Sequence, residues 1–285
     1  MHDGRGRERT FLLRFDYLLG GSPEIDRRTY EDAAVVAAYG RDGGLQPAER
    51  LILKRFQPVI AQMDMLDIGV GAGRTARHFA PLVRSYLGID YSHAMIEHCR
   101  ADQPAVRFEV CDARVLDFVA DESFDLVLFS YNGIDHLHAA DRARVLLGMK
   151  RVLRPKGFLV FSSHNTNFIV PTMEMFRFKP SSTLRGTLRS LKWAMVFNLR
   201  NPTLRFRLPL AEGRIVDGAH GFQSSGNHYV RPDLQVAALR RLGLEPLECI
   251  GNDRDEGVDA ADDRVAVMPD PWVYYVSRKP AGEVS

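Results

Sequence analysis

An acidic residue followed by three alternate glycines is the feature of this chain that could most directly support chemistry. Asp67 ends an apolar stretch, and Gly69, Gly71 and Gly73 come next. Alternate glycines allow a sharp backbone turn and let a ligand approach with no Cβ in the way, while the first turn of the following helix offers unpaired N–H groups. The pattern therefore predicts a strand-to-helix turn that binds a nucleotide-like ligand.

The spacing of the glycines and the position of the acid limit which ligand this is. A dinucleotide site needs G-x-G-x-x-G, but Arg74 stands where its third glycine should be. The Asp67 carboxylate would repel a pyrophosphate, whereas it could pair with an ammonium group. We therefore expect a ligand with a cationic part, and a nicotinamide dehydrogenase becomes a remote alternative.

A second acid follows the next predicted strand, residues 85–89. Asp90 ends this strand, and Tyr91 and Met95 open the helix after it. A carboxylate can accept from two ribose hydroxyls at once, which suits a nucleoside. Two simpler interpretations stand beside this one: Asp90 could cap the helix, and Met95 could be a core residue whose contact with a base is incidental.

The turn resembles motif I of the class I S-adenosylmethionine-dependent methyltransferases, E/D-x-G-x-G-x-G, which binds the methionine part of the cofactor. Residues 152–162 (VLRPKGFLVFS) are also typical of that family, and the resemblance covers residues 63–163 closely and 231–279 in outline. It implies S-adenosylmethionine as cofactor, S-adenosylhomocysteine as product and an adenine site at Asp112, although Asp112 could instead be a turn residue bonding its own backbone. The residues expected to hold the cofactor are Asp67, Gly69, Gly71, Gly73, Arg74, Asp90, Tyr91, Met95, Asp112, Ala113, Ser130 and Tyr131.

Histidines after the fourth predicted strand, residues 124–130, are the candidate bases. Ligands of open α/β sheets collect beyond the carboxyl ends of the strands, so residues 131–138 should face the transferring methyl group. Methyl transfer needs a base only to remove the proton of the acceptor, and histidine suits that task. His136 is the first candidate and His138 the second; the alternative is that both are surface or capping residues. The expected acceptor-binding residues are Tyr39, His164, Asn165, His228 and Tyr229.

Strands alternating with helices predict an α/β fold with a doubly wound, seven-stranded, mostly parallel sheet. Residues 1–62 should form helices that close over the site, with helices at 30–39 and 47–60. Residues 63–164 and 229–285 should form the cofactor-binding domain, in which the strands 245–250 and 272–277 are similar to the antiparallel sixth and seventh strands of the methyltransferase fold. Residues 165–228 are an insertion rich in arginine, which we interpret as a substrate lid with a solvated basic face; the arginines could instead contact an acidic substrate.

Composition narrows the class of protein further. The chain has 285 residues, 45% hydrophobic and 26% charged, as in an ordinary globular protein, and its net charge of +2 is too small to suggest a nucleic-acid partner. No apolar run approaches the ~20 residues that span a bilayer, so no membrane partner is expected. Three scattered cysteines favour reduced thiols in a cytoplasmic protein without a metal site. The sequence is compatible with a homodimer.

The sequence therefore predicts an enzyme that transfers a methyl group from S-adenosylmethionine to an oxygen or nitrogen of a small molecule, held under a lid. Two alternatives remain. The basic insertion could serve an RNA or other nucleic-acid methyltransferase, although residues 130–133 (SYNG) lack the Asn/Asp-Pro-Pro-Tyr pattern of base-amino enzymes. The chain could also bind the cofactor without catalysis.

Overall fold

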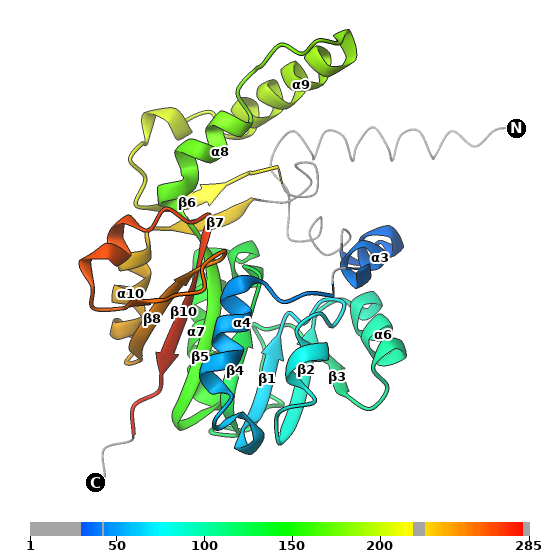
Figure 1. Cartoon of the computed structure of the whole chain (residues 1–285), viewed down its shortest axis with the longest axis vertical. Coiled ribbons are helices and arrows are strands. Elements are labelled where there is room, and N and C mark those ends of the chain that lie inside the picture. Colours follow the sequence, from blue (N-terminus) through cyan, green and yellow to red (C-terminus); the bar gives the residue numbers. More distant parts are fainter. Residues whose placement is uncertain (1–29, 42, 219–225, 282–285) are drawn as a thin grey trace, which may run out of the picture.

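A single twisted sheet forms the centre of the molecule in the computed structural model, which describes residues 30–41, 43–218 and 226–281 (Figure 1). Its strands lie in the order β3-β2-β1-β4-β5-β10-β8-β9, and a hairpin of β6 and β7 joins it at β5. The strands are β1 (Asp64–Ile68), β2 (Ser85–Asp90), β3 (Arg107–Val110), β4 (Phe124–Phe129), β5 (Leu153–Asn165), β6 (Glu212–Ile215), β7 (Asn227–Val230), β8 (Glu245–Gly251), β9 (Val258–Asp259) and β10 (Trp272–Arg278).

The predicted seven-stranded, mostly parallel arrangement is confirmed as the core from β3 to β8. Strands β3, β2, β1, β4 and β5 pair in parallel, and β10 runs antiparallel to both of its neighbours, β5 and β8. Because β10 opposes both, β8 points the same way as the parallel strands. We expected both closing strands, β8 and β10, to be antiparallel to the others. Only β10 is antiparallel.

Helices cover both faces of the sheet, because successive side chains along each strand point to opposite faces. Leu66 and Ile68 of β1 pack with α7 (Ala139–Val152) and α10 (Pro232–Arg241) in one apolar cluster. Met65, on the opposite face, packs with α4 (Pro47–Phe56) and α5 (Ala76–Phe79). The third helix on that side is α6 (His93–Asp102), which contacts α3 (Ala33–Arg41).

The two leading helices are shorter than the sequence predicts. The backbone N–H groups of Ala34 and Val35 donate to the Asp32 carboxylate, so α3 begins after that residue and not at residue 30. Helix α4 ends at Phe56, two residues ahead of Pro58, because proline has no backbone N–H with which to continue the helix. The other predicted leading residues, 1–29, lie outside the described part of the chain.

The insertion after β5 carries its own small apolar core. It contains α8 (Ile169–Met175), α9 (Leu184–Arg200) and the β6–β7 hairpin, whose β7 pairs in parallel with the end of β5. Phe176 and Phe197 stack on each other at 4.9 Å within a cluster that includes Ile215 and Tyr229. The hairpin, and not α9, is the part of the insertion that meets the sheet.

A buried ion pair holds the carboxyl end of the sheet together. Arg142 of α7 donates to Asp135 at 2.6 Å, to Ser163 of β5 at 3.1 Å and to Gln235 of α10 at 2.6 Å. Burial disfavours the charged form of Asp135, but Arg142 and His164 outweigh it and hold the pKa of this carboxyl below its ordinary value. Three elements around the strand ends are thus fixed by one guanidinium.

Replacing this guanidinium by an apolar side chain should destabilise the fold strongly. Arg142→Met leaves the Asp135 carboxylate buried without its cation, which costs about 3 kcal/mol or more in the free energy of unfolding. Urea unfolding followed by circular dichroism measures the change. Arg144→Gln, an exposed substitution on the same helix, is the matched control and should shift the free energy by less than about 0.5 kcal/mol. Equal stability of the two variants would contradict this account.

Candidate active site

The glycine turn after β1 has the backbone conformation that the sequence predicts. Gly69, Gly71 and Gly73 have φ angles of 65°, 54° and 81°, a region that favours glycine. A Cβ on Gly69 would come within 2.6 Å of the Phe129 ring, so this glycine is required by packing. A Cβ on Gly71 would meet nothing closer than the Tyr39 ring at 3.9 Å, because Gly71 faces open space.

That open space is a cavity of about 360 Å³ beyond the carboxyl ends of the strands. It brings together residues that the sequence assigns to the cofactor and residues that it assigns to the acceptor. The predicted residues that line it are Tyr39, Gly69, Gly71, Asp90, Tyr91, Met95, Asp112, Ala113, Ser130, Tyr131, His136 and His164. A neighbouring cavity of about 300 Å³ shares Tyr39, Gly69, Gly71, Ser130 and Tyr131 and adds Arg74.

Asp90 connects the end of β2 to the glycine turn. Its carboxylate accepts from the backbone N–H of Gly71 and that of Ser92, each at 2.9 Å. Helix α6 is capped by Ser92, whose hydroxyl accepts from the Met95 N–H, so Asp90 is not the cap. Burial raises the pKa of Asp90 to about 6, and the carboxylate lines the cavity, where it can accept from a ligand hydroxyl.

Asp67 lies elsewhere than the resemblance suggests. Its side chain points to the sheet face opposite Leu66 and Ile68, where its carboxylate accepts from the hydroxyls of Thr75 at 2.5 Å and Tyr86 at 2.6 Å. It is fully buried, which raises its pKa to about 6, and it is not among the residues lining either cavity. A contact between Asp67 and an ammonium group stays a prediction. In the structure this acid stabilises the turn through its hydrogen bond with Thr75.

A buried acid that the sequence analysis missed lies beside the turn. Glu49 of α4 accepts from Arg74, from the Ser130 hydroxyl and from Tyr274. Burial opposes its ionisation, but the Arg74 guanidinium outweighs this and lowers the pKa of Glu49. The pair fixes Arg74 at the edge of the second cavity. The sequence does carry the helix-start pattern of Gln46 and Glu49, but that pattern predicts only a capped helix.

Asp112, the acid expected at the adenine site, forms hydrogen bonds within its own loop. Asp112 accepts from the backbone N–H of Arg114 at 2.9 Å and pairs with the same residue's guanidinium at 2.6 Å. The turn interpretation of Asp112 is therefore observed, while Asp112 and Ala113 also line the cavity. The two roles are compatible because each carboxylate oxygen has two acceptor sites.

The chain after β4 is bent sharply toward the cavity. Tyr131 and Asn132 have φ angles of 55° and 60°, which non-glycine residues rarely adopt. His136 lines the cavity, and its Nε2 lies 3.0 Å from the Tyr30 hydroxyl. His138 is exposed at the N-cap position of α7, its side chain makes no capping hydrogen bond, and it does not line either cavity, which agrees with the surface alternative.

His164 is held by the buried acid Asp135. The Asp135 carboxylate accepts from the His164 backbone N–H at 2.7 Å and lies 2.8 Å from its Nδ1. The imidazole packs against Tyr229, with ring centroids 4.7 Å apart, and lines the cavity. An acid bonded to Nδ1 fixes the tautomer that leaves Nε2 able to accept a proton. Sequence reasoning placed His164 near the acceptor but did not identify Asp135 as its partner.

Comparison with known proteins identifies a domain within the chain. A methyltransferase domain model matches residues 65–157. A protein of Mycobacterium tuberculosis named as a probable S-adenosylmethionine-dependent methyltransferase is 32% identical over 117 residues, which cover 41% of each chain. A demethylmenaquinone methyltransferase of Renibacterium salmoninarum is 32% identical over 128 residues, or 45% of this chain and 50% of that one. Residues 65–157 therefore form a methyltransferase domain similar to that of S-adenosylmethionine-dependent enzymes.

Solved structures of methyltransferases share the fold of this chain. A methyltransferase from Streptomyces caelestis superposes with a TM-score of 0.56 at 18% identity, over 89% of this chain and 98% of that one. The 1,6-didemethyltoxoflavin N1-methyltransferase of Burkholderia thailandensis, solved with S-adenosylhomocysteine and its acceptor bound, gives 0.54 at 16% identity, over 96% and 90%. The match to the curated relatives spans half of their length or less, so these comparisons establish the domain and its fold.

The cavity fits the nucleoside part of S-adenosylmethionine. Asp90 presents a carboxylate to hydroxyl donors, Gly71 leaves the space that a side chain would fill, and Tyr91 and Met95 supply apolar walls. Met95 also packs with Val36 and Ala72, as the core interpretation predicted. The residues present therefore suit a nucleoside.

Three of the predicted acceptor residues lie behind the cavity wall. Asn165 donates to the carbonyls of Met268 and Asp270, which links the end of β5 to the segment before β10. His228 is buried, which lowers its pKa to about 4 and keeps it neutral near pH 7. Tyr229 donates to Asp217 at 3.0 Å. None of the three is among the lining residues, although Tyr229 supports His164.

Several lining residues were not anticipated from the sequence. Tyr30 precedes α3, Asp217 and Asn227 come from the insertion, and Trp272 opens β10. Asn227 donates to Asp217 at 2.7 Å, which joins the two sides of the hairpin. Asp217 is one of three acids in the basic insertion, a signal that the sequence carried. Asn227 reaches the cavity only because β7 pairs with β5, and Trp272 only because β10 pairs with β5.

Affinity for S-adenosylmethionine should depend on the charge of Asp90. Asp90→Asn should raise the Kd on the order of tenfold at pH 7.5, because an amide presents fewer acceptor sites to hydroxyl donors. The charged form exists above the pKa of about 6, so the affinity of the unaltered protein should fall as the pH drops through that value. Isothermal titration calorimetry measures both effects.

The control for this prediction is Asp102→Asn, which changes an exposed acid on the neighbouring helix α6. It should keep the affinity and the pH dependence of the unaltered protein, whereas the affinity of Asp90→Asn should vary less between pH 5 and 7. An Asp90→Asn protein with full affinity would show that the ribose interpretation is wrong.

Proposed function

We propose that this protein transfers the methyl group of S-adenosylmethionine to an oxygen or nitrogen of a small molecule. One observation carries the proposal: a single cavity is lined both by the cofactor residues Gly71 and Asp90 and by the imidazole of His164. A cofactor and an acceptor bound in it would lie next to each other. Methyl transfer is an in-line displacement, for which such positioning supplies much of the rate.

Each part of the chain has a distinct task in this proposal. The cofactor supplies an activated methyl group when bound. Asp90 and the glycine turn hold its nucleoside, and Ser130, Tyr131 and Tyr39 lie where the two cavities join. The β6–β7 hairpin, through Asp217 and Asn227, closes the acceptor side, which supports the lid proposed for the insertion. Water is excluded from the reacting atoms by these walls.

His164 is the base that the geometry favours, ahead of His136. Its Nδ1 is bonded to Asp135, a buried acid that Arg142 keeps charged, so Nε2 is the nitrogen that takes a proton from the acceptor. The Nε2 of His136 lies against the Tyr30 hydroxyl instead. His136 and Tyr30 then form part of the wall that positions the acceptor.

The reaction itself is tested by release of S-adenosylhomocysteine. The protein is incubated with S-adenosylmethionine and panels of phenols, carboxylic acids and amines, and product is detected by mass spectrometry. Turnover with a member of these panels is the expected result. Binding of the cofactor by calorimetry without turnover in any panel or in cell extract would favour a cofactor-binding protein without catalysis.

Substitution of His164 should lower the rate of the chemical step more than acceptor binding. His164→Gln should reduce kcat on the order of a hundredfold with a small change in KM. His78→Gln, at an exposed histidine bonded to the Gly43 carbonyl, is the matched control and should leave kcat unchanged. If His136→Gln lost this activity while His164→Gln kept it, the roles of the two residues would be exchanged.

A further inference from the structure

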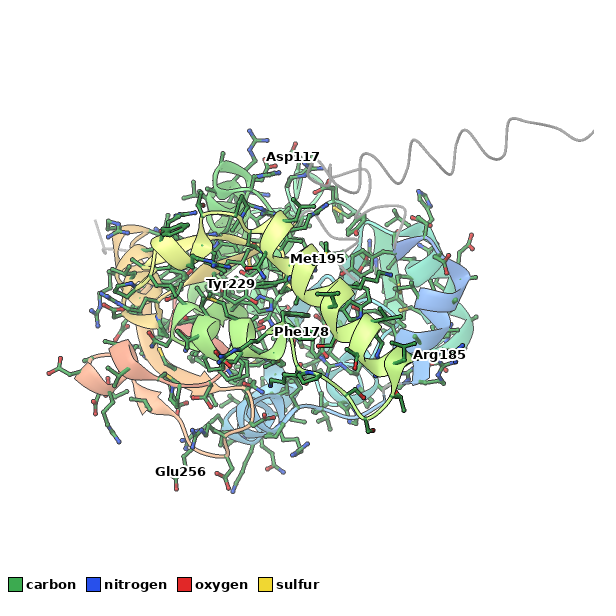
Figure 2. The ribbon with its side chains drawn as sticks, turned by 90° about the horizontal axis from the view of Figure 1, so that it is seen from above. Asp117, Phe178, Arg185, Met195, Tyr229 and Glu256 are labelled. Atoms are coloured by element: carbon green, nitrogen blue, oxygen red, sulfur yellow. The ribbon has the colours of Figure 1, made fainter. Side chains whose placement is uncertain are left out.

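Helix α9 exposes a continuous apolar stripe. Leu184, Leu188, Leu191, Met195 and Leu199 are between 42% and 77% exposed. At 100° per residue they fall within an arc of roughly 80° on one side of the helix. Figure 2 shows α9 lying across the molecule on the side seen from above, with Met195 and Arg185 labelled on it. Large apolar side chains aligned in this way mark a binding surface.

The opposite side of α9 packs on the rest of the insertion. Ala194 and Phe197 are buried, and Phe197 packs with Phe176 against the core of the insertion. The helix therefore does not need its outer stripe in order to attach to the protein. Within the described residues no other element covers the stripe, and Figure 1 shows α9 extending away from the sheet.

Basic residues border the stripe along one side. Arg185, Arg189 and Lys192 follow next around the helix and are exposed. The segment that contains them has no acidic residue between positions 176 and 211, whereas its basic residues are Arg177, Lys179, Arg185, Arg189, Lys192, Arg200, Arg205 and Arg207. The local charge is thus +8 in a chain whose net charge is +2. This concentration selects an anionic partner.

We propose that α9 binds the surface of an anionic lipid bilayer, lying in the plane of the interface. An apolar stripe beside arginines and lysines is the pattern of helices that insert their apolar side among acyl chains while their cations meet lipid phosphates. No described helix is long and apolar enough to cross a bilayer, which agrees with a helix that lies on the surface. The earlier expectation of no membrane partner considered only spanning segments.

Two other partners fit the surface less well. A second copy of the chain docking through the same stripe would bring two +8 segments together, and like charges would oppose the contact. A nucleic acid would use the cations but would leave the apolar stripe in water. A bilayer uses both features at once.

Vesicle flotation with the full-length protein tests this proposal. Binding to phosphatidylcholine vesicles that contain roughly one-third phosphatidylglycerol should be at least about tenfold tighter than to phosphatidylcholine alone. The double variant Arg185→Gln/Arg189→Gln should lose on the order of tenfold or more of this binding. The double variant Leu188→Gln/Met195→Gln should lose binding to the anionic vesicles because the stripe can no longer insert.

Matched controls are available on α7, where Leu147→Gln and Arg144→Gln alter an exposed leucine and an exposed arginine away from α9. Both should bind like the unaltered protein, and all variants should keep its thermal midpoint because the positions are exposed. Failure to bind anionic vesicles would overturn the proposal. So would a dimer in light scattering that Leu188→Gln/Met195→Gln dissolves, or binding of single-stranded RNA that depends on Arg185 and Arg189 in place of vesicle binding.

Discussion

The buried ion pair between Asp135 and Arg142 is the interaction on which the arrangement of the site depends. The guanidinium joins α7 to β5 and α10, and the carboxylate it neutralises in turn holds His164. Without the cation, burial would favour the protonated acid, and the imidazole would lose the charged partner at its Nδ1. Structural stability and the proposed chemistry therefore share one pair of charges.

Two aspartates near the ends of neighbouring strands show how position along a strand assigns different tasks to the same residue type. Asp67 lies within β1, where it pairs with Gly88 and the hydroxyls of Thr75 and Tyr86 occupy its carboxylate. Asp90 ends β2 beside the glycine turn and lines the cavity. Both are buried and both have a pKa raised to about 6, so burial and pKa alone do not separate an acid that stabilises the turn from an acid that can bind a ligand. The position along the strand does, because the register puts both side chains on the same face and Asp90 lies beyond Gly88 at the strand end.

The insertion has two faces with different functions in our account. Its hairpin pairs with β5 and brings Asp217 and Asn227 to the cavity. Its longest helix packs one side on the insertion's own core and leaves leucines and arginines outward. A methyltransferase with such a surface would meet acceptors that dissolve in or lie on a bilayer, because the helix that we place on the membrane and the hairpin that closes the cavity belong to one segment.

The sequence alone predicted the α/β class, the mostly parallel sheet and the glycine turn, because local patterns carry them: apolar strands, the alternate glycines, and acids at strand ends. The tertiary structure decided the rest. Only the pairing of β7 with β5 and of β10 with β5 brings Asp217 and Trp272 to the cavity, and only the pairing of β4 with β5 brings the loop after β4 next to His164 and gives it its partner Asp135. These contacts join residues far apart in the chain, and no local spacing encodes them.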